Sequence, residues 1–301
     1  MKQLNENIFH LYNKWKEGYV RKENDVKTLI KNFLNGRDDI KDFAISEDGK
    51  SVSYIGSDYF YIYDDDLING EIPIPFDTVF NTIIFNCKTL KSLKNAPKHV
   101  VGGLYLNFVP ELKSLDDYIE KVDGVVMIVK CGLTSLENFP SANKECYFMD
   151  CNNISSLKGL PDNCETITLY KCNGLTSLEG APNGTKHFYI KQCENISSLE
   201  GAPRKVEGNF GITGCNKIES LEGAPDEVGG IFNCSKNKNL KSIKTNITSV
   251  DVFECDGCPS LTSLEGLPKT INQIKIDKRF TKEDVRNICD VKVKIIYDEK
   301  K

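Results

Sequence analysis

The chain has 301 residues, 40% of them hydrophobic, which is enough for one elongated domain or two compact ones. Its net charge of −4 is small, and lysine is spread along the chain without the basic stripe of a nucleic-acid-binding protein. The first residues lack a continuous apolar stretch, and no apolar run approaches the roughly 20 residues of a membrane helix. We therefore expect a cytoplasmic protein that binds neither nucleic acid nor membrane.

Residues 1–78 do not share the repeat found further along the chain and are expected to form a small α/β domain. Apolar residues follow helical spacing in 8–15 and 26–33, and Gly36 is a typical helix stop. Because the first coil of a solenoid needs a cover, this domain is interpreted as an N-terminal cap, with a separate recognition domain as the alternative.

The second half of this domain has the pattern of strands. Residues 42–56 predict two strands around an Asp48–Gly49 turn, and Tyr59–Tyr63 predicts a third strand. Three consecutive aspartates follow at 64–66. A calcium loop spaces its oxygen ligands along the chain, so these aspartates are interpreted as a solvated turn.

Residues 79–277 carry an internal repeat. The sequence Ser-Leu-Glu-Gly-Ala-Pro begins at Ser177, Ser198 and Ser220, which are 21 and 22 residues apart. A period of this length indicates a solenoid. Since glycine tolerates turn geometry and proline ends strand pairing, the motif is interpreted as the turn that closes each coil. The serines of the nine regular copies are Ser92, Ser114, Ser135, Ser156, Ser177, Ser198, Ser220, Ser242 and Ser263.

Each repeat contains one short predicted strand, in which two apolar residues flank a single outward residue. Strands stacked about 4.8 Å apart form a parallel sheet, so we expect about nine to ten coils. The inward pairs include Ile167 and Leu169, Phe188 and Ile190, Phe210 and Ile212, and Phe232 and Cys234.

Six of the 12 cysteines recur just after the strand, and Cys131 lies one residue out of phase with them. This structural column consists of Cys87, Cys151, Cys172, Cys193, Cys215 and Cys258, and Asn237 fills the position in another repeat. The pattern resembles the leucine-rich repeat, whose consensus carries Asn or Cys after the strand. Two residues, instead of one, separate the cysteine from the next apolar residue.

This resemblance covers residues 79–277. It implies an α/β-type solenoid, an arc with a parallel β-sheet on the concave face and short, irregular convex sides. It also implies that the cysteines turn inward and satisfy backbone groups. The amino-acid sequence around the turn motif is similar to that of leucine-rich-repeat proteins encoded by tailed phages and some bacteria. That similarity implies a phage or bacterial protein acting on a host factor, in the host cytoplasm if phage-encoded.

No metal, cofactor or catalytic residue is predicted. Cys255 and Cys258 form a Cys-x-x-Cys pair, but both stand at ordinary phases of the repeat, and no second pair completes a tetrahedral site. The histidines His10, His99 and His187 are scattered over unrelated segments. The glycine pairs lack the lysine and the helix of a phosphate-binding loop. We therefore expect a protein that is not an enzyme.

Residues 278–301 are interpreted as a C-terminal cap. Thr281 and Asp284 have the spacing of a capping box, which predicts a short helix. Val291–Tyr297 alternates valine or isoleucine with lysine, which is typical of an edge strand.

The outward residues of the predicted strands differ between the two halves of the repeat. The first half is aromatic and apolar, beginning with Ile83 and Phe85, whereas the second half is polar or small. An exposed apolar patch usually marks an interaction surface, and tyrosine and methionine are favoured there. The predicted partner-binding residues are Tyr105, Met127, Tyr147, Met149, Tyr170 and Tyr189.

We expect these residues to bind another protein through the concave strand face of a non-enzymatic scaffold. The alternatives are a structural, virion or surface component, or a homodimer formed through the same face.

Overall fold

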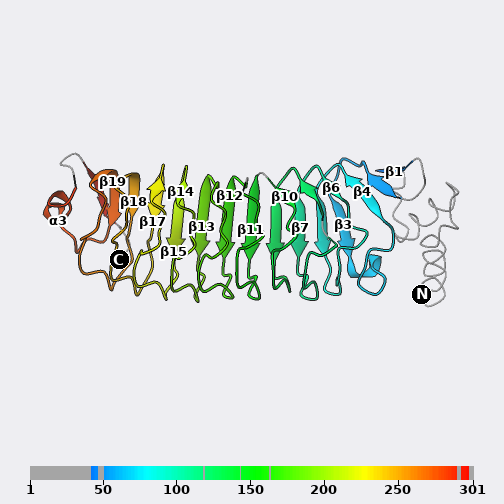
Figure 1. The fold of residues 1–301 in the computed structure, drawn as a ribbon, viewed down its shortest axis with the longest axis horizontal. Helices are drawn as coiled ribbons and strands as arrows, with labels where there is room; N and C mark the ends of the chain where they lie inside the picture. Colours follow the sequence, from blue (N-terminus) through cyan, green and yellow to red (C-terminus); the bar gives the residue numbers. More distant parts are fainter. Residues whose placement is uncertain are drawn as a thin grey trace. The chain divides into compact units, whose positions relative to one another are not determined.

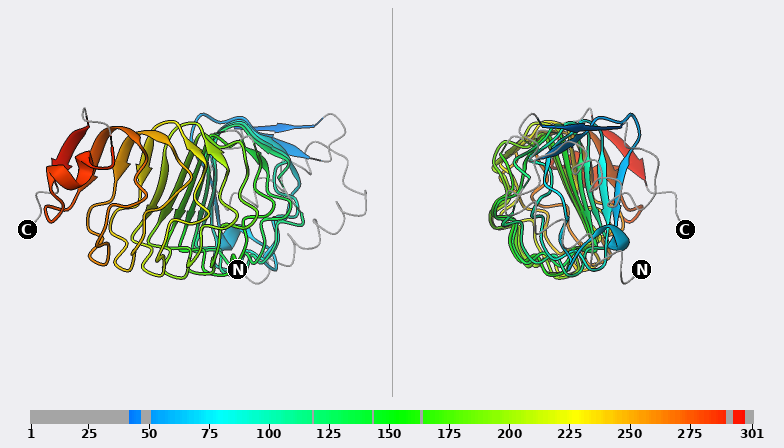
Figure 2. Two further views of the ribbon diagram at one scale, coloured as in Figure 1. Left: turned by 60° about the vertical axis from the view of Figure 1, so that its left-hand side comes forward. Right: turned by 90° about the vertical axis from the view of Figure 1, so that its right-hand side faces the viewer.

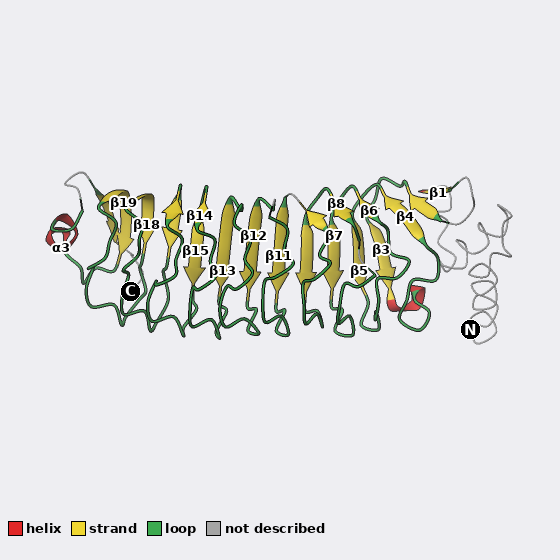
Figure 3. Ribbon diagram, viewed as in Figure 1, coloured by secondary structure: helices red, strands yellow, loops and turns green. Residues whose placement is uncertain are grey.

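The protein is a parallel β-solenoid of about eleven coils. Strands alternate with loops, and the α-helix among the described residues, α3 (Lys282–Arg286), has five residues (Figure 3). The solenoid predicted from the repeat is therefore confirmed, whereas the α/β class expected for it finds no support. The computed structural model describes residues 42–46, 51–117, 119–142, 144–162, 164–289 and 293–297.

The chain divides into two compact units, which we treat separately. The first comprises Met1–Leu133 and Glu137–Asn143, and the second comprises Thr134–Leu136 and Lys144–Lys301.

The first unit contains two layers of strands (Figure 1). In one, β1 and β2 are antiparallel, and β4, β6, β8 and β10 follow in parallel. In the other, β3, β5, β7 and β9 are parallel neighbours in that order. The strands are β1 (Phe43–Ile45), β2 (Val52–Tyr54), β3 (Phe60–Tyr63), β4 (Phe76–Val79), β5 (Ile83–Asn86), β6 (His99–Val100), β7 (Leu104–Asn107), β8 (Lys121–Val122), β9 (Val126–Val129) and β10 (Ser141–Ala142).

In the second unit, β11, β12, β13, β15, β17, β18, β19 and β20 lie side by side as parallel neighbours (Figures 1 and 2). Two short strands, β14 and β16, pair separately. The strands are β11 (Glu145–Met149), β12 (Thr166–Tyr170), β13 (His187–Lys191), β14 (Lys205–Val206), β15 (Phe210–Thr213), β16 (Glu227–Val228), β17 (Ile231–Asn233), β18 (Ser249–Glu254), β19 (Thr270–Ile276) and β20 (Lys294–Tyr297).

A column of phenylalanines forms part of the core of the second unit. Phe188, Phe210, Phe232 and Phe253 occupy paired positions on successive strands and are fully buried. Neighbouring ring centroids are 5.2–6.2 Å apart. Aromatic pairs at such distances add about 0.5–1.5 kcal/mol each to the gain from burial. The next inward side chains, such as Ile212, are buried too, which confirms the predicted phase of these strands.

In the first predicted coil the phase is wrong by one residue. Ile83 and Phe85, which were expected to face outward, are fully buried, and Ile84 pairs with the outward Tyr105. The reason is that Ile83 pairs with Leu104, 21 residues away, whereas the prediction aligned it with Tyr105, 22 residues away. Successive strand residues face opposite sides, so a slip of one residue exchanges the two faces.

The repeated Ser-Leu-Glu-Gly-Ala-Pro motif forms the closing turn, as predicted. The Ala202 N–H donates to the Leu199 carbonyl at 3.0 Å, and the Ser198 hydroxyl accepts from the Glu200 N–H at 3.0 Å. Gly201 has a φ of +84°, which the third residue of a type II turn requires. A Cβ there would lie 2.6 Å from the Glu179 backbone nitrogen, so the neighbouring coil also excludes larger residues.

The cysteine column connects neighbouring coils. The thiols of Cys87, Cys172, Cys193 and Cys258 lie 3.0–3.7 Å from carbonyl oxygens one coil earlier. Asn237, at the same position, is fully buried and donates to the Ile212 and Cys234 carbonyls at 2.8 and 2.9 Å. Its side-chain oxygen accepts the Cys215 N–H at 2.7 Å. The column therefore satisfies backbone groups where the strands end.

Several elements predicted near the N-terminus are present. β1 and β2 form the expected antiparallel pair, and β3 forms the expected third strand. β3 also pairs with β5, so a strand from 1–78 belongs to the solenoid sheet. The helices expected in 8–33 and the turn at Asp48–Gly49 lie outside the described residues.

The predicted C-terminal elements are also present. Thr281 caps α3 by accepting the Asp284 N–H at 3.1 Å, and the Asp284 carboxylate accepts the Thr281 N–H at 2.7 Å. The edge strand expected over Val291–Tyr297 is observed as β20, parallel to β19.

Replacing Asn237 with alanine should lower the free energy of unfolding by about 3 kcal/mol, because a backbone N–H and carbonyl become buried without partners. Asn237→Cys should lower the free energy of unfolding by less than half as much, because a thiol at this position can donate to a carbonyl of the preceding coil. Urea denaturation followed by circular dichroism measures both. Equal losses for the two variants would show that the polar contacts of this column do not stabilise the coil.

Candidate functional site

Four of the six predicted partner-binding residues form one group in the second unit. Tyr147 on β11 and Tyr189 on β13 flank Thr168 on β12, and Met149 pairs with Tyr170. All except Thr168 are half-buried. Burial raises the pKa of Tyr147, with the neighbouring Tyr170 as a further cause. We call Tyr147, Met149, Tyr170 and Tyr189 the tyrosine surface.

The other two predicted residues belong to the first unit, where Tyr105 on β7 pairs with Met127 on β9. Both are half-buried. Sequence reasoning missed Tyr61 and Tyr63 on β3, which are 38% and 43% exposed and stack at a centroid distance of 5.9 Å. Their alternation with buried residues was the available signal, but the strand was assigned to a cap. The predicted patch therefore falls into two groups, one in each unit.

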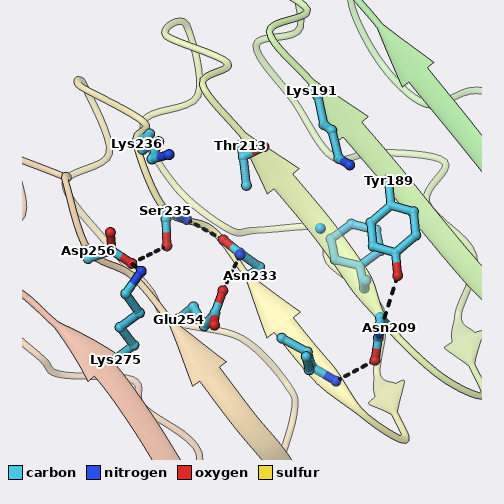
Figure 4. A pocket seen from close by; sticks show the side chains of 13 residues that line it. Tyr189, Lys191, Asn209, Thr213, Asn233, Ser235, Lys236, Glu254, Asp256 and Lys275 are labelled. Carbon is cyan, nitrogen blue, oxygen red and sulfur yellow. Dashed lines mark hydrogen bonds and ion pairs between the residues drawn. The ribbon is translucent and has the colours of Figure 1, made fainter. Parts of the chain in front are cut away.

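Tyr189 is held in place by its neighbour Asn209. The Asn209 amide donates to the Tyr189 hydroxyl at 3.1 Å, and its side-chain oxygen accepts the Ile231 N–H at 2.9 Å (Figure 4). The Asn209 backbone N–H donates to His187 Nδ1 at 3.0 Å. The His187 and Tyr189 rings are stacked, with their centroids 6.2 Å apart. This network holds the tyrosine ring in one orientation.

Next to Tyr189, the outward column is interrupted by Gly211. A Cβ at Gly211 would lie 3.1 Å from Tyr189 Cδ1, so the ring leans over the glycine. An open cavity of about 320 Å³ results, which extends from β13 towards β19. We call this cavity the Gly211 notch. The glycine was visible in the sequence, but its neighbours depend on the register between coils.

The side of the notch opposite Tyr189 is polar and internally bonded (Figure 4). Asn233 donates to the Glu254 carboxylate and accepts the Ser235 N–H at 2.9 Å. The Ser235 hydroxyl donates to Asp256 at 2.8 Å, and Lys275 Nζ lies 3.2 Å from the same carboxylate. The Asp256 side chain is only 2% exposed, so its charge depends on Lys275 for compensation.

Two other lysines line the notch without an acidic partner. Lys191 and Lys236 form no ion pair within the described part of the chain. Lys191 Nζ lies 4.9 Å from the centroid of the Tyr189 ring. Figure 4 shows Lys191 and Lys236 on opposite sides of Thr213.

The cysteines lie inside the coils. All 12 are buried. Burial raises the pKa of Cys258 to about 11 and that of Cys87 to about 12, and it raises those of Cys234 and Cys255 well above the ordinary range. Buried protonated thiols are poor nucleophiles and poor metal ligands. Among the described residues, no group of three or more His, Cys, Asp or Glu side chains is arranged to hold a metal ion.

The three consecutive aspartates form η2 (Asp64–Asp66) and bond to backbone groups. Asp64 accepts the N–H groups of Lys88 and Thr89 at 3.1 and 2.7 Å, and Asp66 accepts the Tyr63 N–H at 2.9 Å. Asp66 is buried, which the interpretation as a solvated turn did not anticipate. These carboxylates shape a bend between neighbouring coils.

Comparisons with known proteins give no family for this chain: no protein-family model, no curated protein and no solved structure matches it. Within the ranges that the structure describes, no helix has the length and apolar character needed to span a bilayer.

The native protein should be almost inert towards a thiol reagent, because every cysteine is buried out of reach of the reagent. Ellman's reagent at pH 8 should report less than one reactive thiol per chain, and all 12 after unfolding in urea. Rapid modification of Cys255 or Cys258 in the folded protein would contradict the structural interpretation of the column.

Replacing Lys275 with methionine should destabilise the protein by about 3 kcal/mol, because it leaves the buried Asp256 carboxylate without compensation. Thermal unfolding measures the effect. Lys278→Met, on an exposed neighbour, is the matched control. The double variant Lys275→Met with Asp256→Asn should recover most of the loss, and failure to recover would show that the ion pair is not the cause.

Proposed function

We propose that this protein is a non-enzymatic scaffold that binds another protein through the tyrosine surface. The observation that carries the proposal is the grouping of Tyr147, Met149, Tyr170 and Tyr189 on three adjacent strands, each half-buried. Tyrosine and methionine are enriched at the centres of protein interfaces. Side chains that the sheet already holds in place lose little conformational entropy on binding.

The chemistry of the described residues also supports a binding role over catalysis. His187 Nδ1 already accepts the Asn209 N–H, and the cysteines are buried among the coils. The polar groups beside Gly211 hydrogen-bond to one another, which holds them in fixed positions and suits recognition.

We further propose that the coils are irregular leucine-rich repeats, with 1–78 and 278–301 as their caps. The bonding of Asn237 and the cysteines to the preceding coil supports this, since that position holds Asn or Cys in the repeat consensus. Buried Val285 of α3 supports a covering role for the C-terminal segment. The 12 buried thiols suit a reducing compartment such as the cytoplasm.

Changing Tyr147 and Tyr170 together to glutamate should abolish capture of the partner and leave the fold intact, because both rings are half-buried on the outward face. The control places two glutamates on the exposed loop residues Thr176 and Ser197. Affinity capture from a cell lysate compares the two variants with the unmodified chain, and circular dichroism checks folding.

Three outcomes are informative. Partner capture that survives Tyr147→Glu with Tyr170→Glu contradicts the proposal, and unfolding of that variant alone shows that the rings belong to the core. Concentration-dependent dimerisation in sedimentation, abolished by the same pair of changes, favours self-assembly through this face.

A further inference from the structure

The Gly211 notch has features that the tyrosine surface lacks. It combines one aromatic ring, a floor without a side chain, and polar groups that stand around the opposite rim (Figure 4). Ligand sites in proteins combine apolar contact with a few placed polar groups in this way. Its volume of about 320 Å³ is large enough for a single ring-sized ligand.

The aromatic ring is prepared for stacking. Asn209 bonds to the Tyr189 hydroxyl, and Lys191 lies against the ring, so its orientation is fixed from two directions. A flat ligand with apolar C–H groups on one face gains contact with such a ring without turning it, although the exposed Lys191 side chain, whose ammonium lies over the ring, has to move aside. A pyranose sugar has this shape, with hydroxyl groups around its edge.

The rim supplies both donors and acceptors. Glu254 has a carboxylate oxygen for hydroxyl donors, and Lys191 and Lys236 supply ammonium donors. Sugar hydroxyls donate and accept at once, so they match such a mixed rim. A nucleobase buries two flat apolar faces, and here the side opposite Tyr189 carries the charged Glu254.

The charges indicate a particular kind of sugar. Asp256 and Lys275 neutralise each other. Lys191 and Lys236 then leave two positive charges against the single negative charge of Glu254. The lining of the notch therefore carries one positive charge in excess, which one carboxylate on the ligand would balance.

We infer that the Gly211 notch binds an acidic pyranose, a uronic acid unit of a glycan, with its ring on Tyr189 and its carboxylate at Lys191 or Lys236. This site goes beyond the proposed protein partner. It uses the polar side of Tyr189, whereas the protein partner contacts β11–β13.

The test compares sugars that differ only in the carboxylate. Galacturonic acid and galactose, and glucuronic acid and glucose, are titrated into the full chain at millimolar concentration. Saturation-transfer NMR detects contact with the sugar C–H protons. The uronic acid should bind about fivefold more tightly than its neutral partner, as one exposed charge pair contributes. This preference should disappear in 500 mM salt, where the Debye length is only about 4 Å.

Gly211→Val tests the position of the site. Its φ is not in the left-handed region, and β-branched residues favour strands, so the backbone accepts valine. The new Cβ would lie 3.1 Å from Tyr189 Cδ1, so the ring has to shift, and circular dichroism checks that the variant still folds. The added side chain fills the notch, and uronic acid binding should fall at least tenfold. Thr168→Val, in the same outward column on β12, is the control and should bind as the unmodified chain does. Lys191→Met and Lys236→Met leave the cavity unfilled, and the change at the lysine that holds the carboxylate should remove the preference for the uronic acid. A preference that survives in both variants contradicts the proposal.

The proposal is overturned if none of the four sugars binds, if galactose and galacturonic acid bind equally, or if Gly211→Val binds as well as Thr168→Val. Stronger binding of adenosine monophosphate than of either uronic acid would assign the notch to a nucleotide instead. Tyr147→Glu with Tyr170→Glu should leave sugar binding unchanged, so loss of the protein partner and loss of the sugar are measured independently.

Discussion

The register of backbone pairing between successive coils determines the other contacts of the second unit. Because each strand pairs in parallel with the next, Phe188, Phe210, Phe232 and Phe253 fall above one another inside the coil. The same register brings Asn237 to the Ile212 carbonyl and the closing turn at Gly201 to Glu179 in the turn before it. A slip of one residue would turn the phenylalanines outward and leave these polar groups unsatisfied. Among the described residues, every buried side-chain nitrogen and oxygen has a hydrogen-bond partner.

The same constraint also orders the outer surface. Outward residues cannot rearrange independently, since the backbone holds each one beside its equivalents on the neighbouring strands. Where the column holds Tyr147 and Tyr189, the result is a set of rings in fixed positions. Where it holds Gly211, the strand has no outward side chain, and the residues on the adjacent strands line the resulting cavity. A single glycine therefore creates a cavity because the adjacent coils do not collapse into it.

Sequence reasoning succeeded where information is contained within one repeat. The period, the inward phase around Phe210, the turn glycines and the capping box at Thr281 all depend on short-range patterns. It failed where the number of residues between coils decides the outcome, as for Ile83, which a single residue moves from one face to the other. The division into two compact units could not be predicted either, because the repeat period continues unchanged through both units.

The candidate site was predictable to a similar extent. Tyr147 and Tyr189 could be placed on the outward face because their phase follows from the repeat. The notch could not, because it depends on how the Tyr189 ring leans over a residue 22 positions later and on which carboxylate Lys275 meets. Both are properties of side chains packed across coils.

Tyr189 stands at the boundary between two chemically different parts of one sheet. Towards β11 its neighbours are Tyr147, Tyr170 and Met149, and contact with them removes apolar surface from water. Towards β19 the outward positions carry amides, carboxylates and lysines, which stay hydrated unless a ligand offers matching hydrogen bonds. A protein partner with an apolar face gains little from covering the polar part, because it would strip water from charges that it cannot pair. A small polyhydroxylated ligand gains little from the apolar part. The register that aligns the coils thus places two surfaces of different chemistry on one sheet, and Tyr189 belongs to both.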